Sequence, residues 1–364
     1  MIQDSAAVVR RDIDQFIQRN RIPGIQYTVV DADGIRFEHQ SGYADLASSR
    51  LVSPETTFMA SSSTKVITAA AVLQLAERQK LELDKPLSTY YSNHSYTEKV
   101  TIRHLLTQTA GMPNPLPLKW LHRADGHDRF NEERALQQTL QHHSKLTSSP
   151  GEKYGYSNIS YWLLGKAVES ASGRSFSEYV REQIFEPLEI PPSAASFQIE
   201  NPVVHATGYQ RSLSLQGLIL YLLMDRRLLG KTVKGYRSLL PVYMNGPAYG
   251  GLICTATAFG LFLQALLRPT PRLFSAQTRE LMFKHQVTAA GNETGMSLGW
   301  RIGHTQKEPY YGKPGGGPGF RSNVRLYPRL GLGVAWLANE TGVSETQMNS
   351  LSDTIDRHWF SSWR

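Results

Sequence analysis

The chain has 364 residues, of which 40% are hydrophobic and 19% are charged, and this composition excludes a wholly disordered protein. Its formal net charge is +8, but the basic residues form no long run, so the sequence gives no reason to expect a nucleic-acid partner. The single cysteine, Cys254, excludes an intrachain disulfide and a cysteine-based zinc site.

Two segments of the chain bear on whether it carries a secretion signal or a membrane-spanning helix. Residues 1–5 carry neither a positive charge nor an apolar stretch, so we expect no secretion signal and a cytoplasmic protein. The longest apolar run, residues 213–224, has 12 residues, whereas a membrane-spanning helix needs about 20. We therefore expect a core helix in this run, with a lid or a dimer face as alternatives.

The spacing of apolar residues changes along the chain. Strand-like patterns occur near both ends, and a mainly helical block from 84 to about 237 separates them, with loops around 111–117 and 147–158. In chain order, the elements predicted outside this block are a helix at 6–19, strands at 25–30 and 35–39, a helix at 62–79, strands at 296–302, 320–327 and 331–337, and a helix at 345–360.

A sheet whose strands come from both ends of the chain must have the helical block inserted between them. The sequence therefore predicts an α/β (α+β) fold, in which an antiparallel sheet is flanked by N- and C-terminal helices and carries an inserted, mostly helical domain. The predicted division is a discontinuous α/β domain, residues 1–84 and 246–364, and a helical domain, residues 85–245.

Ser62 and Lys65 form a Ser-x-x-Lys motif at the start of a predicted helix. Residues three apart share a helix face, so the lysine can reach the serine hydroxyl. A lysine acts as a base only when burial or a neighbouring cation lowers its pKa, and the apolar continuation of this helix indicates burial. The alternative is a helix-capping serine followed by a solvated lysine.

Three Tyr-x-Asn motifs could supply a further proton-transfer group, and they begin at Tyr91, Tyr156 and Tyr243. A tyrosine near the serine could exchange its proton, and an asparagine amide could hold both the lysine and a substrate carbonyl. One active site has room for one such motif, so at least two of the three are structural.

Residues 313–320 read Lys-Pro-Gly-Gly-Gly-Pro-Gly-Phe and stand just before a predicted strand. Glycines let a substrate approach the backbone closely and leave an N–H free to stabilise an oxyanion. A flexible turn is the alternative. The segment lacks the strand-to-helix setting of a phosphate-binding loop, so nucleotide binding is disfavoured.

The ordered set Ser62-x-x-Lys65, Tyr156-x-Asn158 and Lys313-x-Gly315 resembles the serine β-lactamase and penicillin-binding-protein superfamily. More closely, it resembles the class C-like branch that includes the family VIII carboxylesterases. The similarity covers roughly residues 7 to 340, and residues 190–245 match poorly. Its strongest stretches are 58–65, 101–113, 150–158 and 249–252.

The resemblance implies a role for each matched residue. Ser62 would be the acylated nucleophile, Lys65 and Tyr156 the proton-transfer pair, and Asn158 the residue that orients Lys65 and the substrate. The N–H groups of Ser62 and Gly316 would form the oxyanion hole. The context of the third stretch selects Tyr156 over the other two tyrosines. The resemblance requires no cofactor and no metal, and it leaves open whether Lys65 or Tyr156 accepts the first proton.

Pro314 departs from the family pattern, which usually has a hydroxyl residue between the lysine and the glycine. Proline offers neither a side-chain donor nor an N–H, so half of the site that would hold a substrate carboxylate is lost and Lys313 remains. We therefore expect a carboxylesterase acting on short to medium acyl chains, with a small-molecule ester or amide as its partner.

Two kinds of alternative remain open. The first is another activity of the same superfamily: a weak β-lactamase, a D-amino-acid peptidase or amidase, or an acyltransferase. The second is a catalytically silent binding or regulatory protein with the same fold. The sequence does not indicate an oligomeric state.

A few other side chains could contribute to a site. His104, in a leucine-rich segment, is expected to be packed rather than catalytic. Trp120, Tyr154 and Tyr249 stand near matched stretches and could line an acyl pocket, or could equally belong to the core.

Overall fold

The computed structural model describes residues 2–115, 120–212, 224–270, 272–306, 308–342 and 344–360. Its centre is a nine-stranded antiparallel sheet that uses strands from both ends of the chain, as predicted. In spatial order the strands are β12 (Gln286–Val287), β13 (Glu293–Met296), β14 (Arg301–Thr305), β15 (Glu308–Gly317), β16 (Phe320–Tyr327), β17 (Leu332–Ala338), β1 (Gly24–Val30), β2 (Ile35–Asp45) and β3 (Arg50–Leu51).

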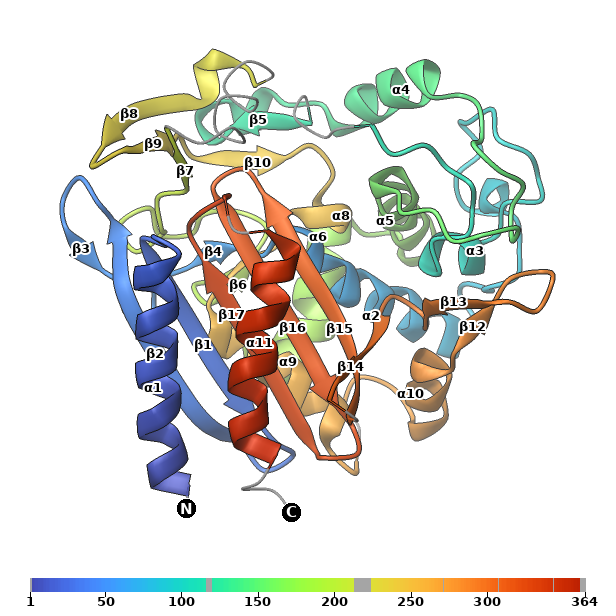
Figure 1. The fold of residues 1–364 in the computed structure, drawn as a ribbon. Helices are drawn as coiled ribbons and strands as arrows, with labels where there is room; N and C mark the ends of the chain where they lie inside the picture. The colour runs from blue at the N-terminus through green and yellow to red at the C-terminus, as the bar shows by residue number, and fades with distance from the viewer. Residues whose placement is uncertain are drawn as a thin grey trace.

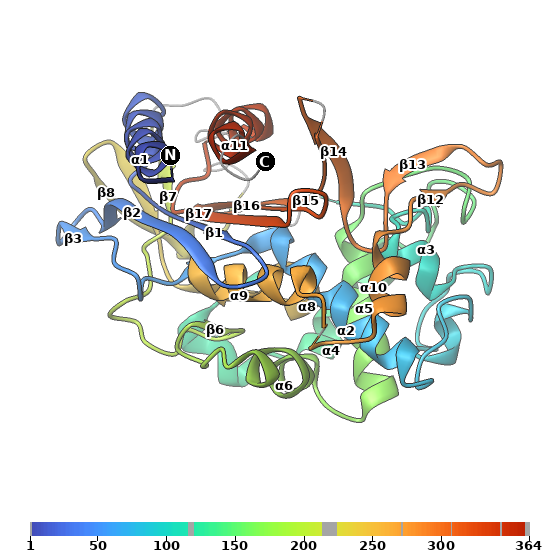
Figure 2. The same cartoon turned by 90° about the horizontal axis from the view of Figure 1, so that it is seen from below.

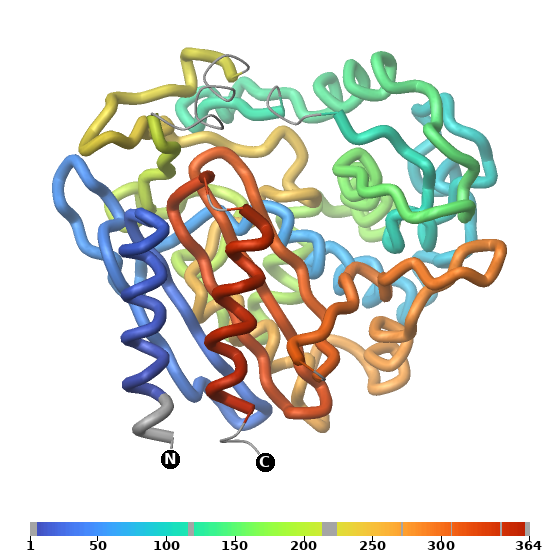
Figure 3. Tube along the Cα trace, viewed as in Figure 1, coloured from blue at the N-terminus to red at the C-terminus, as the bar shows by residue number. Residues whose placement is uncertain are grey.

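Helices cover both faces of this sheet (Figure 2). On one face lie α1 (Ile2–Arg19) and α11 (Glu345–Phe360), which come from the two ends of the chain and contact each other (Figure 3). On the other face α9 (Ala256–Leu267) packs on β17 and β1. The central strands β1 and β17 are therefore buried along their whole length, which explains the unbroken apolar sequence of β17 and the mostly apolar sequence of β1.

The mainly helical part of the molecule is built around α2 (Thr64–Glu77), whose residues from Thr64 to Leu75 are all buried. A helix that is apolar on every side is expected in such a central position. Around it, as shown in Figure 1, lie α3 (Ile102–Leu106), α4 (Glu132–His142), α5 (Asn158–Ser172), α6 (Phe176–Val180), α8 (Pro247–Gly250) and α10 (Ala276–Phe283).

Short strands that the apolar pattern did not predict form three further sheets. They are β4 (Phe58–Met59), β11 (Ile253–Cys254) and β6 (Ala195–Ser196) in one; β10 (Val242–Met244) and β5 (Leu121–Arg123) in another; and β7 (Tyr209–Arg211), β9 (Tyr236–Leu239) and β8 (Leu229–Val233) in the third. Most of these strands are two to four residues long, too short for an alternating pattern to stand out.

The structure corrects two local predictions. The strand predicted at 296–302 is interrupted by a turn, in which the N–H of Ser297 donates to the carbonyl of Trp300 and Gly299 has a φ of +96°. The glycine-rich segment is not a loop that precedes a strand, because residues 313–317 are the end of β15 and pair with β16.

The structure bears less directly on the apolar run, the division into domains and the question of a membrane-spanning helix. The run 213–223 lies outside the described residues, and the division into two domains stays a prediction. Of the helices that the structure describes, none combines the length and the apolar character needed to cross a bilayer.

Candidate active site

Ser62 lies in a short 3-10 helix, η1 (Ser61–Ser63), that leads directly into α2. The turn is set by its neighbours: the N–H of Ala60 donates to the carbonyl of Leu252, and that of Ser63 donates to the carbonyl of Ala60. Ser61 is buried and has a φ of +48°. A non-glycine residue in this left-handed region is uncommon, and such residues cluster at functional sites.

Hydrogen bonds join the η1 turn to the end of β15 and to the neighbouring strand β16. The hydroxyl of Ser63 donates to the carbonyl of Lys313 over 2.8 Å, and the hydroxyl of Ser322 donates to the carbonyl of Ala60 over 2.6 Å. A Cβ on Gly315 would overlap both Ser322 Oγ and the carbonyl oxygen of Ala60. The glycine of the Lys-x-Gly motif therefore lets the serine-bearing turn approach the strand.

The structure brings together the side chains of all three predicted catalytic residues. Ser62 Oγ lies 2.7 Å from Tyr156 Oη and 3.3 Å from Lys65 Nζ. Asn158 Oδ1 accepts hydrogen bonds from Lys65 Nζ at 2.8 Å and from Tyr156 Oη at 3.2 Å. The serine hydroxyl thus has two groups within reach that could exchange a proton with it.

Lys65 is fully buried, and burial is the main cause that lowers its pKa well below the ordinary value for lysine. The charge of Lys313 acts in the same direction. Besides Asn158, Lys65 Nζ donates to the backbone carbonyl of Tyr249 over 2.5 Å. No carboxylate is among these partners, so none of them offsets the effect of burial with a full negative charge.

Burial shifts the pKa of Tyr156 in the direction opposite to that of Lys65. Burial raises its pKa above the ordinary value for tyrosine, and the hydrogen bond to Ser62 offsets only part of that rise. Lys65 Nζ lies 5.1 Å from the centroid of the Tyr156 ring, and Lys313 Nζ lies 4.9 Å from it. The phenol is therefore protonated at neutral pH.

Ser62 opens into a cavity of about 430 Å³ at the end of β15. Among the described residues that line it, the charged side chains are Arg301, Lys313, Arg321 and Glu345. Arg301 Nη1 and Glu345 Oε1 form an ion pair at 2.5 Å. Lys313 is buried, and that burial, together with the charge of Arg301, lowers its pKa to about 7.

Gly316 and Pro314 line the same cavity. Gly316 is exposed, and the guanidinium of Arg321, from the neighbouring strand β16, lies where a Cβ on Gly316 would stand. Any side chain at position 316 would displace this guanidinium. The glycine therefore leaves room for a cation next to its own backbone.

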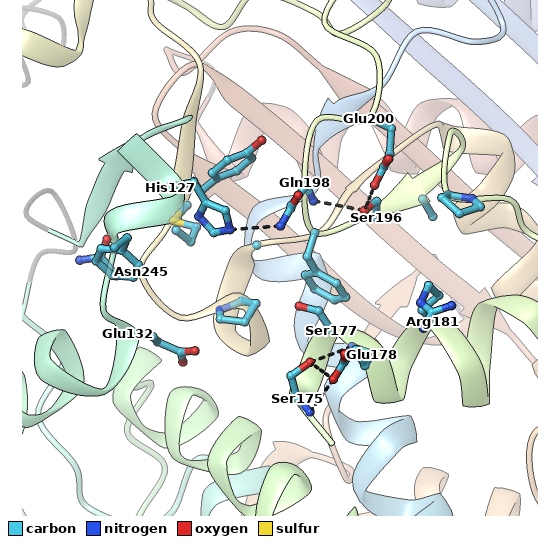
Figure 4. Close-up of a pocket in the computed structure, with 18 of the residues that line it drawn as sticks. His127, Glu132, Ser175, Ser177, Glu178, Arg181, Ser196, Gln198, Glu200 and Asn245 are labelled. Carbon is cyan, nitrogen blue, oxygen red and sulfur yellow. Dashed lines mark hydrogen bonds between the residues drawn. The ribbon is translucent and has the colours of Figure 1, made fainter. Parts of the chain in front are cut away.

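The other two Tyr-x-Asn motifs lie elsewhere. The hydroxyl of Tyr91 donates to Glu133 Oε1 over 2.7 Å. Tyr243 and Asn245 line a separate cavity of about 570 Å³, shown in Figure 4, in which Asn245 Oδ1 contacts His122 Nδ1 at 3.0 Å. Among the three tyrosines, Tyr156 is the one whose hydroxyl contacts Ser62.

The remaining candidates divide between the cavity and the core. Tyr154 lines the cavity beside Ser62. Trp120 and Tyr249 are buried and pack against each other and Trp162, with ring centroids 5.5–5.8 Å apart. His104 forms a capping box at the start of α3 with Thr101, which is a structural role.

Comparison with known proteins agrees with this geometry. A sequence model of the family named Beta-lactamase matches residues 9–353. The chain belongs to this family. The resemblance read from the sequence motifs is thus confirmed.

Individual relatives are distant. "Protein flp" of Staphylococcus aureus (strain N315) is 28% identical over 217 residues, which cover 58% of this chain and 42% of that protein. The chain thus spans less than half the length of the curated relatives it matches.

Two solved structures share the fold of this chain. D-amino acid amidase from Ochrobactrum anthropi SV3, complexed with L-phenylalanine amide, has a TM-score of 0.81 at 18% identity, covering 100% of this chain and 99% of the other. A class C beta-lactamase has a TM-score of 0.75 at 18% identity, covering 98% and 96%. At these identities the likeness concerns the fold.

Sequence reasoning missed several residues of the cavity. Arg301, Arg321 and Glu345 come from β14, β16 and α11, which lie far apart along the chain or outside any recognised motif. No local spacing marks them as neighbours of Ser62. Only the order of the strands in the sheet and the position of α11 over its end bring them there.

Proposed function

We propose that the protein is a serine hydrolase that acts through an acyl-enzyme on carboxylic esters of short to medium acyl chain. The observation that carries this proposal is the contact of Ser62 Oγ with both Tyr156 Oη and Lys65 Nζ at the mouth of a cavity. A serine hydroxyl needs such a neighbouring base to become a nucleophile.

The hydrogen-bond partners of Lys65 support its role as the first base. A neutral amine has two N–H groups and one lone pair. The two N–H groups can donate to Asn158 Oδ1 and to the carbonyl of Tyr249, the two nearest acceptors. The lone pair then faces Ser62 Oγ and can accept the hydroxyl proton as Oγ attacks the substrate carbonyl carbon.

Tyr156 suits the second proton transfer. Because its phenol stays protonated, its single O–H can donate either to Asn158 Oδ1 or to Ser62 Oγ in the resting enzyme, and later to the leaving alcohol. The alkoxide leaves as it gains this proton, and Tyr156 is reprotonated at the expense of the Lys65 ammonium. Water then attacks the acyl-enzyme by the same steps in reverse and releases the acid.

The tetrahedral intermediate carries a negative charge on its oxygen, and hydrogen-bond donors are needed to stabilise that charge. We assign the N–H groups of Ser62 and Gly316 to this role, since both residues line the cavity. Loss of one such donor typically reduces the rate by about 10²–10³-fold. If an alcohol or an amine outcompetes water at the acyl-enzyme, the same machinery becomes an acyltransferase.

A second candidate is hydrolysis of an amide, peptide or lactam that carries a carboxylate. The observation that favours it is the presence of Arg301, Lys313 and Arg321 in the cavity with Ser62. Against it stand Pro314, which offers no donor, and Glu345, which already forms an ion pair with Arg301. Esters without a charge require none of these cations.

The first experiment is a series of p-nitrophenyl esters from acetate to decanoate, measured on the wild type and on Ser62→Ala together. The proposal expects hydrolysis by the wild type, none by the variant, and a chain-length optimum set by the cavity. Hydrolysis that is equal in both proteins would contradict it. Faster turnover of a chromogenic cephalosporin or of D-amino-acid amides would favour the second candidate.

A fluorophosphonate probe separates an active hydrolase from a catalytically silent protein with the same fold. Labelling at Ser62, located by mass spectrometry, is the expected result, because the probe reacts with an activated serine. An unlabelled protein that also hydrolyses neither esters nor amides would be a binding or regulatory protein.

A further inference from the structure

Tyr156 and Asn158 stand on either side of Ser157, so the position of the Ser157 backbone fixes both side chains. The backbone N–H of Ser157 donates to Gln108 Oε1 over 2.7 Å, and the carbonyl of Ser157 accepts from Gln108 Nε2 over 3.1 Å. One side-chain amide thus binds both backbone polar groups of this residue, as a neighbouring strand would.

The backbone of Gln108 adds a third bond to the same segment. Its carbonyl accepts from the N–H of Gly155 over 2.8 Å, so Gln108 binds the chain immediately before and immediately after Tyr156. Gln108 is completely buried, which shields these bonds from competition with water.

The conformation of Gln108 is itself unusual. Its φ is +59°, in the left-handed region that residues other than glycine, asparagine and aspartate seldom adopt. Such a conformation persists only where the surroundings determine it, and such residues concentrate near functional sites. Here the conformation turns the side-chain amide toward Ser157.

We propose that Gln108 is a positioning residue that holds Tyr156 and Asn158 at the distances from Ser62 and Lys65 that the reaction requires. This inference rests on the proposed function. Gln108 lies outside the set of described residues that line the Ser62 cavity, so it acts through Ser157 and not on the substrate. A displacement of about 1 Å in a catalytic group can reduce the rate by about 10²-fold.

The test replaces Gln108 by methionine, which keeps the size of the side chain and removes both bonds to Ser157. Gln26 provides a matched control. It is also buried, its Oε1 accepts from the N–H of Ala256 over 2.8 Å, and its Nε2 donates to the carbonyl of Ser53 over 2.6 Å. Gln26→Met therefore removes a similar pair of bonds on β1, together with a longer one from Nε2 to the carbonyl of Pro54 at 3.2 Å.

We expect the two variants to lose similar thermal stability and to differ in catalysis. Gln108→Met should lose about 10²-fold in kcat with little change in KM, and its Ser62 should react correspondingly more slowly with a fluorophosphonate. Gln26→Met should keep wild-type kcat per folded molecule. Equal kcat values in the two variants would overturn the proposal.

Gln108→Glu provides a second variant with a pH signature. When its buried carboxyl is protonated, the O–H can donate to the Ser157 carbonyl and replace the lost N–H. When it ionises, a carboxylate oxygen faces that carbonyl instead. The activity of Gln108→Glu relative to wild type should therefore fall as pH rises, and an activity ratio independent of pH would contradict the role of the donated bond.

The outcomes also separate this inference from the proposed function. If the wild type and Gln26→Met neither hydrolyse esters nor react with the probe, the proposed function fails. If both are active and Gln108→Met equals them, the function stands and the positioning role of Gln108 is wrong.

Discussion

Tyr156 Oη lies 2.7 Å from Ser62 Oγ, and burial keeps the tyrosine in its protonated form. The geometry alone would fit either direction of proton transfer between the two hydroxyls. The raised pKa of Tyr156 and the lowered pKa of Lys65 distinguish them, because they make the phenol a proton donor and the amine a proton acceptor.

Replacing Tyr156 by phenylalanine should reduce ester turnover by at least about 10²-fold, because the leaving alcohol loses its proton donor. Steady-state kinetics on an alkyl ester such as ethyl butyrate measure this effect, because an alkoxide needs the proton to leave whereas p-nitrophenolate does not. Tyr91→Phe is the control, since its hydroxyl contacts Glu133 and not Ser62. Equal losses in the two variants would mean that the wrong Tyr-x-Asn motif carries the chemistry.

The pH profile of kcat/KM reports on Lys65. The reactive form is the neutral amine, and its pKa is well below the ordinary value of 10.5. Activity on an uncharged ester should therefore be lost as pH falls through the pKa of Lys65, which lies well below that of an ordinary lysine. A profile that rises only above about pH 10 would show that Lys65 is an ordinary lysine, and Lys65→Met should remove the hydrolysis.

Lys313 should give anionic substrates a pH dependence of their own. Its pKa is lowered to about 7, so its charge disappears as pH rises through that value. The KM of a p-nitrophenyl hemisuccinate should rise roughly fivefold from about pH 6 to 8, which corresponds to about 1 kcal/mol of charge attraction. The KM of the uncharged butyrate ester should stay constant.

Two variants check the assignment of that pH dependence. Lys313→Gln should remove it, whereas Lys80→Gln, at an exposed lysine after the end of α2, should preserve it. A hemisuccinate whose KM does not change with pH in the wild type would exclude Lys313 as an anion-binding group. It would also weaken the case for substrates that carry a carboxylate.

The main sheet and its flanking helices could be predicted because burial leaves a clear pattern over long elements. The predicted strand at 320–327 and the predicted helix at 345–360 coincide with β16 and α11. The strand β15 was missed, because Lys313 to Gly317 has neither alternation nor β-branched residues. Its strand conformation depends on pairing with β16 and on contact with the η1 turn.

Some residues of the candidate site could likewise be predicted from local spacing in the sequence, and others could not. Ser62 and Lys65 could be paired from spacing because a helix fixes the relation between residues three apart. Tyr156 and Asn158 needed the family context, since three Tyr-x-Asn motifs have the same spacing. The contribution of Gln108 could not be predicted, because a bond between its side chain and the backbone of Ser157 joins two loops across 49 positions of the chain.

Gly315 should not tolerate alanine. Its Cβ would overlap Ser322 Oγ and the carbonyl oxygen of Ala60, and would lie 3.0 Å from the N–H nitrogen of Ser63. The η1 turn would have to move away from β15, which should destabilise the protein by about 1–3 kcal/mol. The same displacement moves Ser62, so kcat should fall by about 10²-fold. Thermal unfolding and ester kinetics measure the two effects.

The control for this change is Gly34→Ala, in the turn between β1 and β2, where a Cβ meets no atom of the described residues within 4 Å. It should leave both stability and kcat nearly unchanged. Adding Ser322→Ala to Gly315→Ala removes the side-chain part of the overlap but leaves the backbone carbonyl of Ala60 in place. The double variant should therefore recover only part of the loss, and a full recovery would show that Ser322, and not the position of the η1 turn, requires the glycine.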